Sequence, residues 1–95
     1  METTGEEAQE SLRIDRWLWH ARFCKTRAIA RAKATGGRIY LNGHRVEKPG
    51  ARVRIGDVMT LSAGREILAL RVVKLGERRG PATEARTLYE ILDGA

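Results

Sequence analysis

The sequence has little cysteine, few aromatic residues and no long apolar run. Its single cysteine, Cys24, excludes an internal disulfide and any zinc site built from several cysteines. The longest purely apolar run covers residues 67–70, whereas a membrane-spanning helix needs about 20 apolar residues. The first residues lack the basic start and apolar stretch of a signal peptide. These absences predict a cytoplasmic protein with no membrane segment.

Acidic residues are also scarce through most of the chain, which has 95 residues and a net charge of +6. Residues 11–81 hold seventeen Lys and Arg against five acids, whereas residues 1–10 hold four Glu and no base. Residues 82–95 are again acidic, with three acids and one Arg. A basic body attracts polyanions, and nucleic acid is the commonest large one. The alternative is a basic surface that is simply solvated.

Candidate catalytic and metal sites are incomplete. His20 and Cys24 are four residues apart, but two ligands do not complete a zinc site. A Cys–His nucleophile would also need an orienting group and an oxyanion site, and His44 beside a turn supplies neither. Gly36-Gly37-Arg38 lacks the Lys and Ser/Thr of a phosphate-binding loop. The sequence therefore predicts no enzyme, no metal and no cofactor.

Hydrophobic spacing predicts an acidic, disordered tail at residues 1–11 and a single domain at residues 12–95. Residues 12–23 read as a helix, because apolar side chains recur at helical spacing and Asp15 suits the helix N-terminus. The members of this stripe are Ile14, Trp17, Leu18 and Ala21. A second helix is expected from an N-cap at Thr26 to about Thr35, where Gly36-Gly37 stops it. The short link predicts a tight helix-turn-helix corner.

The spacing then changes to the period of two that is typical of strands. Asn42-Gly43 favours a type I′ hairpin turn between strands at 38–41 and 44–47. Further extended segments are expected at 53–55, 58–63 and 66–75, followed by a last helix capped by Thr83. The last helix would carry Ala85, Leu88, Tyr89 and Leu92 at helical spacing. Together these elements predict an α+β fold, a helix pair on a small, mostly antiparallel sheet with a C-terminal helix.

The most informative pattern is a basic cluster on the helix pair. Arg27 and Arg31 are four apart and therefore neighbours on one helix face. No acid lies between Asp15 and Glu47, so the cluster has no local partner and favours external phosphates. Trp19 could stack on a base or pack against the later sheet. The residues assigned to this face are Arg13, Arg16, Trp19, His20, Arg22, Lys25, Arg27 and Arg31.

The ordered motifs over residues 13–62 resemble the S4 RNA-binding domain. The matching positions are Ile14-Asp15, Leu18, Arg22, Thr26-Arg27, Ala30, Gly37, Ile39, Leu41, Asn42-Gly43 and Gly56-Asp57. The flanks are most similar to the ribosome-associated heat-shock protein 15 group within that family. The residues that carry this second resemblance are Trp17-Leu18-Trp19, Arg22-Phe23, 25–28, Arg78-Arg79, Pro81-Ala82, Glu84-Ala85 and 88–90.

The resemblance implies the S4-like (alpha-L) fold and binding of structured RNA. For this group it implies ribosomal RNA of the large subunit or ribosome-bound tRNA, including subunits that hold a peptidyl-tRNA after aborted translation in a heat-shock response. We expect a monomer whose RNA-binding residues are Arg16, Trp19, Arg22, Lys25, Thr26, Arg27, Arg31, Lys33, Arg38 and Asn42. The family usually has large hydrophobic residues at the positions of Lys33 and Ala34, so we expect a thin core there.

Two other functions remain open on the sequence. S4 domains also occur in RNA-modifying enzymes and tRNA synthetases, so the chain could be the accessory RNA-binding subunit of a separate enzyme. The helix-turn-helix corner could instead bind DNA. Neither alternative adds a catalytic residue to this chain.

Overall fold

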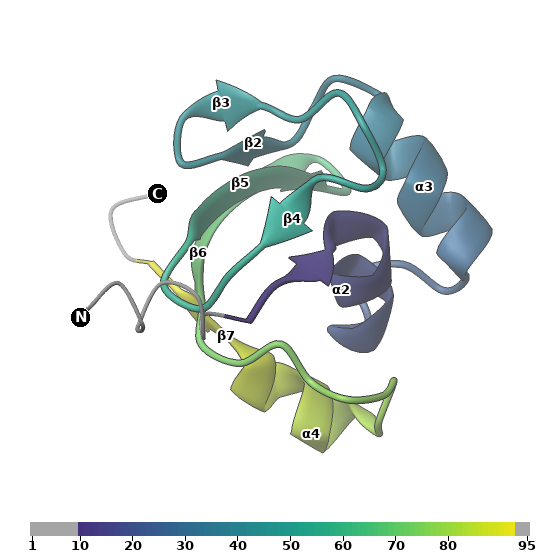
Figure 1. Cartoon of the computed structure of the whole chain (residues 1–95), viewed down its shortest axis with the longest axis vertical. Coiled ribbons are helices and arrows are strands. Elements are labelled where there is room, and N and C mark those ends of the chain that lie inside the picture. The colour runs from purple at the N-terminus through teal and green to yellow at the C-terminus, as the bar shows by residue number, and fades with distance from the viewer. Residues whose placement is uncertain (1–9, 93–95) are drawn as a thin grey trace.

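A computed structural model describes residues 10–92 of the chain as a helix pair packed on a curved antiparallel sheet (Figure 1). The α+β class predicted from the sequence is confirmed. In chain order the elements are β1 (Leu12–Arg13), α2 (Ile14–His20), α3 (Arg27–Thr35), β2 (Tyr40–Leu41), β3 (His44–Arg45), β4 (Arg52–Val53), β5 (Val58–Ala63), β6 (Glu66–Val72), α4 (Ala82–Ala85), the 3-10 turn η1 (Arg86–Leu88) and β7 (Tyr89–Ile91).

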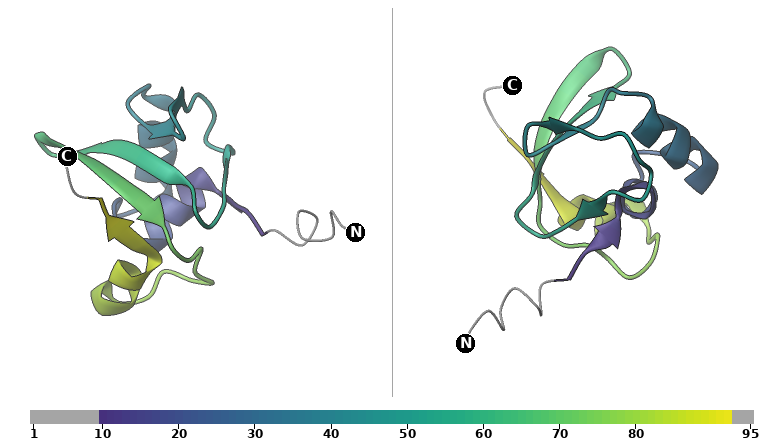
Figure 2. Two further views of the ribbon diagram at one scale, coloured as in Figure 1. Left: turned by 90° about the vertical axis from the view of Figure 1, so that its left-hand side faces the viewer. Right: turned by 45° about the horizontal axis from the view of Figure 1, so that its top comes forward.

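The main sheet has the strand order β3-β2-β5-β6-β7, with every neighbouring pair antiparallel. Its longest ladder joins β5 to β6 from Val58–Arg71 to Ala63–Glu66. A separate two-stranded sheet pairs β1 with β4. Both α2 and α3 lie on the same side of the main sheet (Figures 1 and 2), so the core forms between this helix pair and one sheet face.

The first helix is shorter than the sequence predicts, covering Ile14–His20 rather than residues 12–23. Leu12 and Arg13 are extended because they pair with Val53 and Arg52 of β4. The far end stops early because Arg22 has a φ of 66°, which no α-helix accommodates. The apolar stripe behaves as predicted: Trp17 is fully buried, and its indole Nε1 donates to the Lys74 carbonyl at 2.9 Å.

The second helix confirms the prediction at both ends. The Thr26 hydroxyl accepts a hydrogen bond from the Ile29 amide at 3.0 Å, which satisfies one unpaired N–H of the first turn. Ala30 and Ala34 face the core and are fully buried. The helix ends at Thr35, and Gly37 reverses the chain with a φ of 78°.

The β2–β3 hairpin also follows its sequence signal. Asn42 and Gly43 have φ values of 53° and 85°, as a type I′ turn requires. Tyr40 pairs with Arg45 across the hairpin, and β5 has the bounds 58–63 expected from the sequence.

The prediction of a C-terminal helix is wrong beyond its first turns. Pro81, not Thr83, occupies the N-cap of α4, which is only four residues long. Residues 89–91 then form strand β7, with Tyr89 opposite Val72. The pairing with β6 satisfies the backbone and sets the Tyr89 ring 4.8 Å from that of Phe23, a distant contact that helical spacing cannot reveal.

The predicted acidic tail lies mostly outside the described residues, which begin at Glu10. Ser11 lies against β4, since Arg52 donates to its hydroxyl at 2.9 Å and to its carbonyl oxygen at 3.1 Å. Among residues 10–92, no helix has the length and apolarity needed to cross a membrane.

Candidate nucleic-acid interface

The corner between α2 and α3 brings cationic side chains from both helices to one region. Arg16 belongs to α2 and Arg27 to the first turn of α3, and both are exposed. The two helices pack against each other, and the positive charges of both arginines lower the pKa of His20. We call the exposed cations of this region the corner cations: Arg16, Arg22, Lys25, Arg27 and Arg31.

Within residues 10–92 the corner cations form no ion pair. The three salt bridges of that range join Arg13 to Asp15, Arg71 to Glu90 and Arg78 to Glu84. Among the described residues, no carboxylate therefore forms a direct ion pair with the corner, although Asp15 lies near enough to interact with the charge of Arg27, and such a surface attracts anions.

Arg22 combines an exposed position with a fixed backbone. Its φ of 66° is unusual for a residue with a side chain, and it turns the chain out of α2 toward α3. The guanidinium Nε donates to the Gly80 carbonyl oxygen at 2.7 Å. Arg22 is therefore held in place by the loop after β6 while its side chain stays exposed.

Arg79 also contacts the corner, although it is 60 residues from Trp19 and 55 from Cys24 in the sequence. The prediction from the helix pair did not include it. Its Nε donates to the Trp19 carbonyl oxygen at 3.1 Å, and its Nη2 to that of Cys24 at 3.5 Å. The guanidinium carbon also lies 5.8 Å from the centre of the half-buried Trp19 ring. The available signal was the Arg78-Arg79 pair within the family resemblance, because periodicity cannot place a loop residue.

His20 does not belong to the exposed basic face to which the sequence assigned it. The side chain is 3% exposed, and its Nδ1 lies 3.2 Å from the Leu75 carbonyl oxygen. Burial lowers the pKa of His20 below its usual value, with Arg16 and Arg27 acting in the same direction against the Leu75 hydrogen bond. The loop after β6 covers this side of α2, which the helix period alone could not show.

Arg13 also leaves the predicted face, because it pairs with Asp15. Its Nε and Nη2 donate to the two carboxylate oxygens of Asp15 at 3.1 and 3.0 Å. Burial, the largest influence, would raise the pKa of the Asp15 carboxyl, which is 1% exposed, but the hydrogen bonds and charge of Arg13, the backbone amide of Arg16 and the charge of Arg27 together lower it. The start of α2 thus carries a buried carboxylate with its own counter-ion.

Lys33 and Arg38 lie in a groove of about 410 Å³, separate from the corner's turn. The groove runs between α3 and the β5–β6 hairpin and is lined by Ile29, Ala32, Lys33, Gly36, Arg38, Ser62 and Gly64. Lys33 is half-buried, and its charge acts on the pKa of Cys24, although burial raises that pKa overall.

Thr26 and Asn42 are both engaged within the fold. Thr26 caps α3. The Asn42 amide donates to an Asp57 carboxylate oxygen at 3.1 Å and accepts from the Val58 amide at 2.9 Å. Asn42 thus fastens the hairpin turn to the start of β5, away from the helix corner.

Candidate metal and nucleophile positions are not assembled in residues 10–92. No group of three or more His, Cys, Asp or Glu side chains in that range could hold a metal ion. Cys24 is a buried free thiol whose raised pKa disfavours the reactive thiolate.

Comparison with known proteins decides the family. The family model of the S4 domain matches residues 12–59, which include the helix pair and the β2–β3 hairpin. The chain belongs to the S4 domain family. The matched segment contains all five corner cations, whereas Arg79 lies beyond it.

Several S4 relatives extend the similarity over most of the chain. Heat shock protein 15 of Escherichia coli K12 is 42% identical over 85 residues, covering 90% of this chain and 63% of that protein. The RQC P-site tRNA stabilizing factor of Listeria innocua is 33% identical over 82 residues, covering 86% of this chain and 87% of that protein. The chain thus spans less than two thirds of the length of its heat shock protein 15 relative.

A solved structure of an S4 relative matches the fold. It is described as a trimeric structure of heat shock protein 15 from Vibrio cholerae, with a TM-score of 0.82 and 39% identity. The match covers 88% of this chain and 84% of that one. The S4-like fold predicted from the sequence is therefore confirmed.

Proposed function

We propose that the chain binds structured RNA through the α2–α3 corner and has no catalytic role of its own. The observation that carries this proposal is a set of five exposed cations, contributed by two helices and their turn, with no carboxylate partner among residues 10–92. Structured RNA presents phosphates at fixed spacing, and a rigid corner can match them.

Each part of the corner has a distinct task in this proposal. Arg27 and Arg31 stand one turn apart on α3 and contact adjacent phosphates, while the capped N-terminus of α3 adds its dipole. Arg16 and Lys25 extend the contact along α2 and the turn. Arg22 contacts phosphate with the guanidinium nitrogens not used at Gly80. Lys33 and Arg38 continue the surface toward the sheet.

We assign Trp19, Thr26 and Asn42 to positioning rather than to direct contact. Trp19 supports Arg79 across its ring, Thr26 begins α3, and Asn42 fixes the hairpin. This assignment chooses the packing alternative for Trp19 over stacking on a base.

The RNA that we propose is ribosomal, either large-subunit ribosomal RNA or a tRNA held on that subunit. Support comes from the relatives, one of which is named for stabilizing a P-site tRNA and another for heat shock. Because the chain is shorter than its heat shock protein 15 relative, their shared partner is an inference for this chain. We further propose that the chain is a cytoplasmic monomer with one domain over residues 12–95. Sedimentation equilibrium tests the monomer against the trimer described for the Vibrio cholerae protein.

The deciding experiment compares two double variants of the full chain. Arg27→Ala with Arg31→Ala should weaken binding to large ribosomal subunits by at least about 2 kcal/mol, because two charge-assisted contacts are lost. The control, Arg54→Ala with Lys74→Ala, removes equal charge at exposed positions outside the corner and should cost less than about 0.5 kcal/mol.

Equal losses in the two variants would assign binding to overall charge and reject the corner as the site. Matched-salt competition with duplex DNA separates RNA binding from the helix-turn-helix alternative, which predicts that DNA competes as well as ribosomal RNA. Co-purification with a modifying enzyme instead of ribosomes would favour an accessory subunit.

A further inference from the structure

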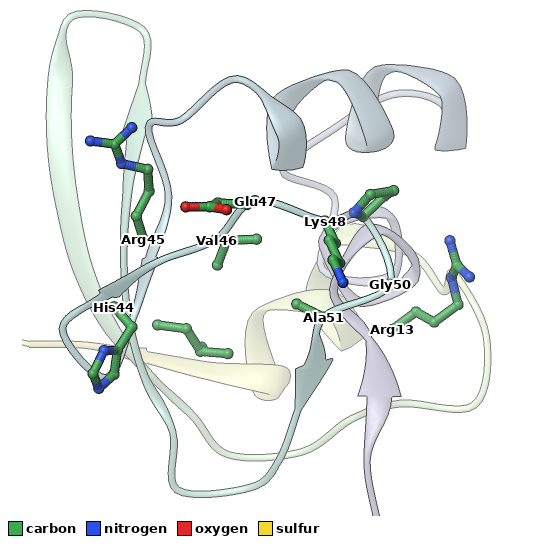
Figure 3. Close-up of a pocket in the computed structure, with 10 residues that line it drawn as sticks. Arg13, His44, Arg45, Val46, Glu47, Lys48, Gly50 and Ala51 are labelled. Carbon is green, nitrogen blue, oxygen red and sulfur yellow. The ribbon is translucent and has the colours of Figure 1, made fainter.

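A cleft of about 550 Å³ lies beneath the loop that connects β3 to β4, outside the corner cations (Figure 3). This volume falls within the range of small-molecule pockets, about 300–1,000 Å³. Its lining residues are Arg13, Leu41, His44, Arg45, Val46, Glu47, Lys48, Pro49, Gly50 and Ala51. Neither the hairpin nor the helix corner explains why an apolar cleft with a basic rim is open here.

The walls of the cleft are held by backbone hydrogen bonds. The Ile14 amide donates to the Ala51 carbonyl at 2.8 Å, and the Ala51 amide donates to that of Lys48 at 3.1 Å. The Val46 amide donates to the Ile39 carbonyl at 2.8 Å on the other side. The loop is therefore anchored to α2 at one end and to the sheet at the other, which makes the cleft a preformed one.

The floor is apolar and the rim is cationic. Val46 is buried, and Leu41 and Ala51 are partly buried beside it. Figure 3 shows Lys48 beneath the loop between Val46 and Arg13, with Arg45 and Glu47 toward the hairpin. Within residues 10–92, neither Arg45 nor Lys48 has an ion-pair partner, so cations exceed carboxylates at the rim even when Asp15 is counted.

Arg13 is the most rigid cation of the rim. Asp15 holds its Nε and Nη2, which leaves Nη1 directed at the loop, 3.4 Å from where a Cβ at residue 50 would lie. The guanidinium thus lies beside the backbone of the loop at Gly50, at van der Waals distance. A guanidinium fixed in this way is ready to bind a phosphate without losing side-chain freedom.

We propose that this cleft binds one unpaired nucleotide of an RNA, with the base on the apolar floor and its phosphates at Arg13 and Lys48. An apolar surface with a rim of cations matches a molecule that joins a flat aromatic ring to an anion. The proposal deepens the RNA-binding function and rests on it for the source of the nucleotide. In this proposal the cleft recognises a base, whereas the corner cations bind phosphates.

The test titrates the isotope-labelled full chain with AMP and follows the backbone amide shifts. We expect shifts at residues 41–51, and at least about tenfold weaker binding of ribose 5-phosphate, which lacks the base. Lys48→Glu should weaken AMP binding about tenfold, whereas Lys74→Glu, the same charge change at an exposed site off the cleft, should change it less than about twofold. Ala51→Leu places a larger side chain on the floor of the cleft and should also weaken AMP binding. If this variant fails to fold, the AMP affinity of Lys48→Glu still tests the proposal.

A single-stranded oligoadenylate of five nucleotides distinguishes RNA from free nucleotide. It should shift the same amides at least about tenfold more tightly than AMP, and equal affinities would overturn the RNA assignment. Equal binding of AMP and ribose 5-phosphate would mean that the cleft binds an anion and does not recognise the base. Amide shifts on AMP addition that are confined to residues 22–31 would reject the cleft as the binding site. Shifts at 41–51 that follow protein concentration alone would assign the cleft to a second copy of the chain.

The corner and the cleft fail independently in this design. Arg27→Ala with Arg31→Ala should lose ribosomal RNA but bind AMP as the unchanged chain does. If the unchanged chain binds ribosomal subunits but not AMP, only the cleft proposal is overturned. If it binds AMP but not ribosomal subunits, only the corner proposal is overturned.

Discussion

The Arg79 guanidinium donates to the Trp19 carbonyl oxygen at 3.1 Å and stands 5.8 Å from the centre of the Trp19 ring, although 60 residues separate the two in sequence. A second hydrogen bond reaches the Cys24 carbonyl oxygen. One side chain from the loop after β6 thus holds both the end of α2 and the turn toward α3. The geometry of the corner therefore depends on a residue outside the helix pair.

Arg79→Ala should destabilise the fold by about 1–2 kcal/mol, since it removes two charged hydrogen bonds that are partly exposed. Urea unfolding measures this loss, and amide hydrogen exchange should accelerate at residues 21–26 in particular. Arg78→Ala is the matched control: its partner Glu84 is exposed, so the change should cost less than about 0.5 kcal/mol. Uniform faster exchange in both variants would contradict a local role for Arg79.

Asp15→Asn should cost about 2–3 kcal/mol, because it leaves the Arg13 guanidinium without its buried partner. The folded pKa of Asp15 lies below its unfolded value, so its contribution is complete above about pH 4 and is lost as the pH falls through the folded pKa. Chemical unfolding across pH 2–6 checks the sign: the difference between the unchanged chain and the variant should shrink in acid. A constant difference would show that Asp15 acts through packing alone.

His20 should make the fold weaker in mild acid. Its folded pKa is lowered, so the unfolded chain takes up a proton first, and the free energy of unfolding falls once the pH drops below about 6.5. His20→Gln should flatten the stability profile between pH 5 and 7. His44→Gln, at an exposed strand position, is the control, and a slope that followed His44 instead would contradict this assignment.

The salt dependence of RNA affinity should report the number of corner contacts. Five phosphate contacts predict a slope of log K against log salt near −3.5 to −4.5. Arg27→Ala with Arg31→Ala should make the slope shallower by about 1.4–1.8. Filter binding or fluorescence titration at several salt concentrations measures both slopes, and a slope near zero would mean that the basic face is only a solvated surface.

Local sequence signals predicted local structure well. Thr26 is followed by a helix because its hydroxyl caps the first turn, and Asn42-Gly43 forms a hairpin turn because both residues tolerate positive φ. The five corner cations were identified from their clustering in the sequence and their positions away from the apolar stripes, and all five are exposed in the structure. These features depend on residues within a few positions of each other.

Most of the errors arose where distant segments decide the outcome, although Arg13 left the predicted face by pairing with the nearby Asp15. Tyr89 sits at helical spacing from Ala85 but forms a strand because β6 offers it a backbone partner. His20 lies on the polar side of α2 yet is buried by the loop that carries Leu75. Arg79 lies in a loop, where no helix or strand periodicity indicates which side chains face the corner. A single sequence contains each of these residues but not the pairing that brings them together.

Three side chains from α2 and the turn after it reach main-chain carbonyl oxygens of the loop after β6. Trp17 reaches that of Lys74, His20 that of Leu75 and Arg22 that of Gly80. Every residue type carries a carbonyl, so exposed positions such as Lys74 and Glu77 can change as long as the length of the loop keeps each oxygen in register, whereas Arg79 and the buried Leu75 also act through their side chains. Insertion of one residue after Gly76 should therefore lower the melting temperature far more than Glu77→Ala does. The length of the loop, more than the identity of its exposed residues, therefore sets where these three oxygens meet the side chains from α2 and its following turn.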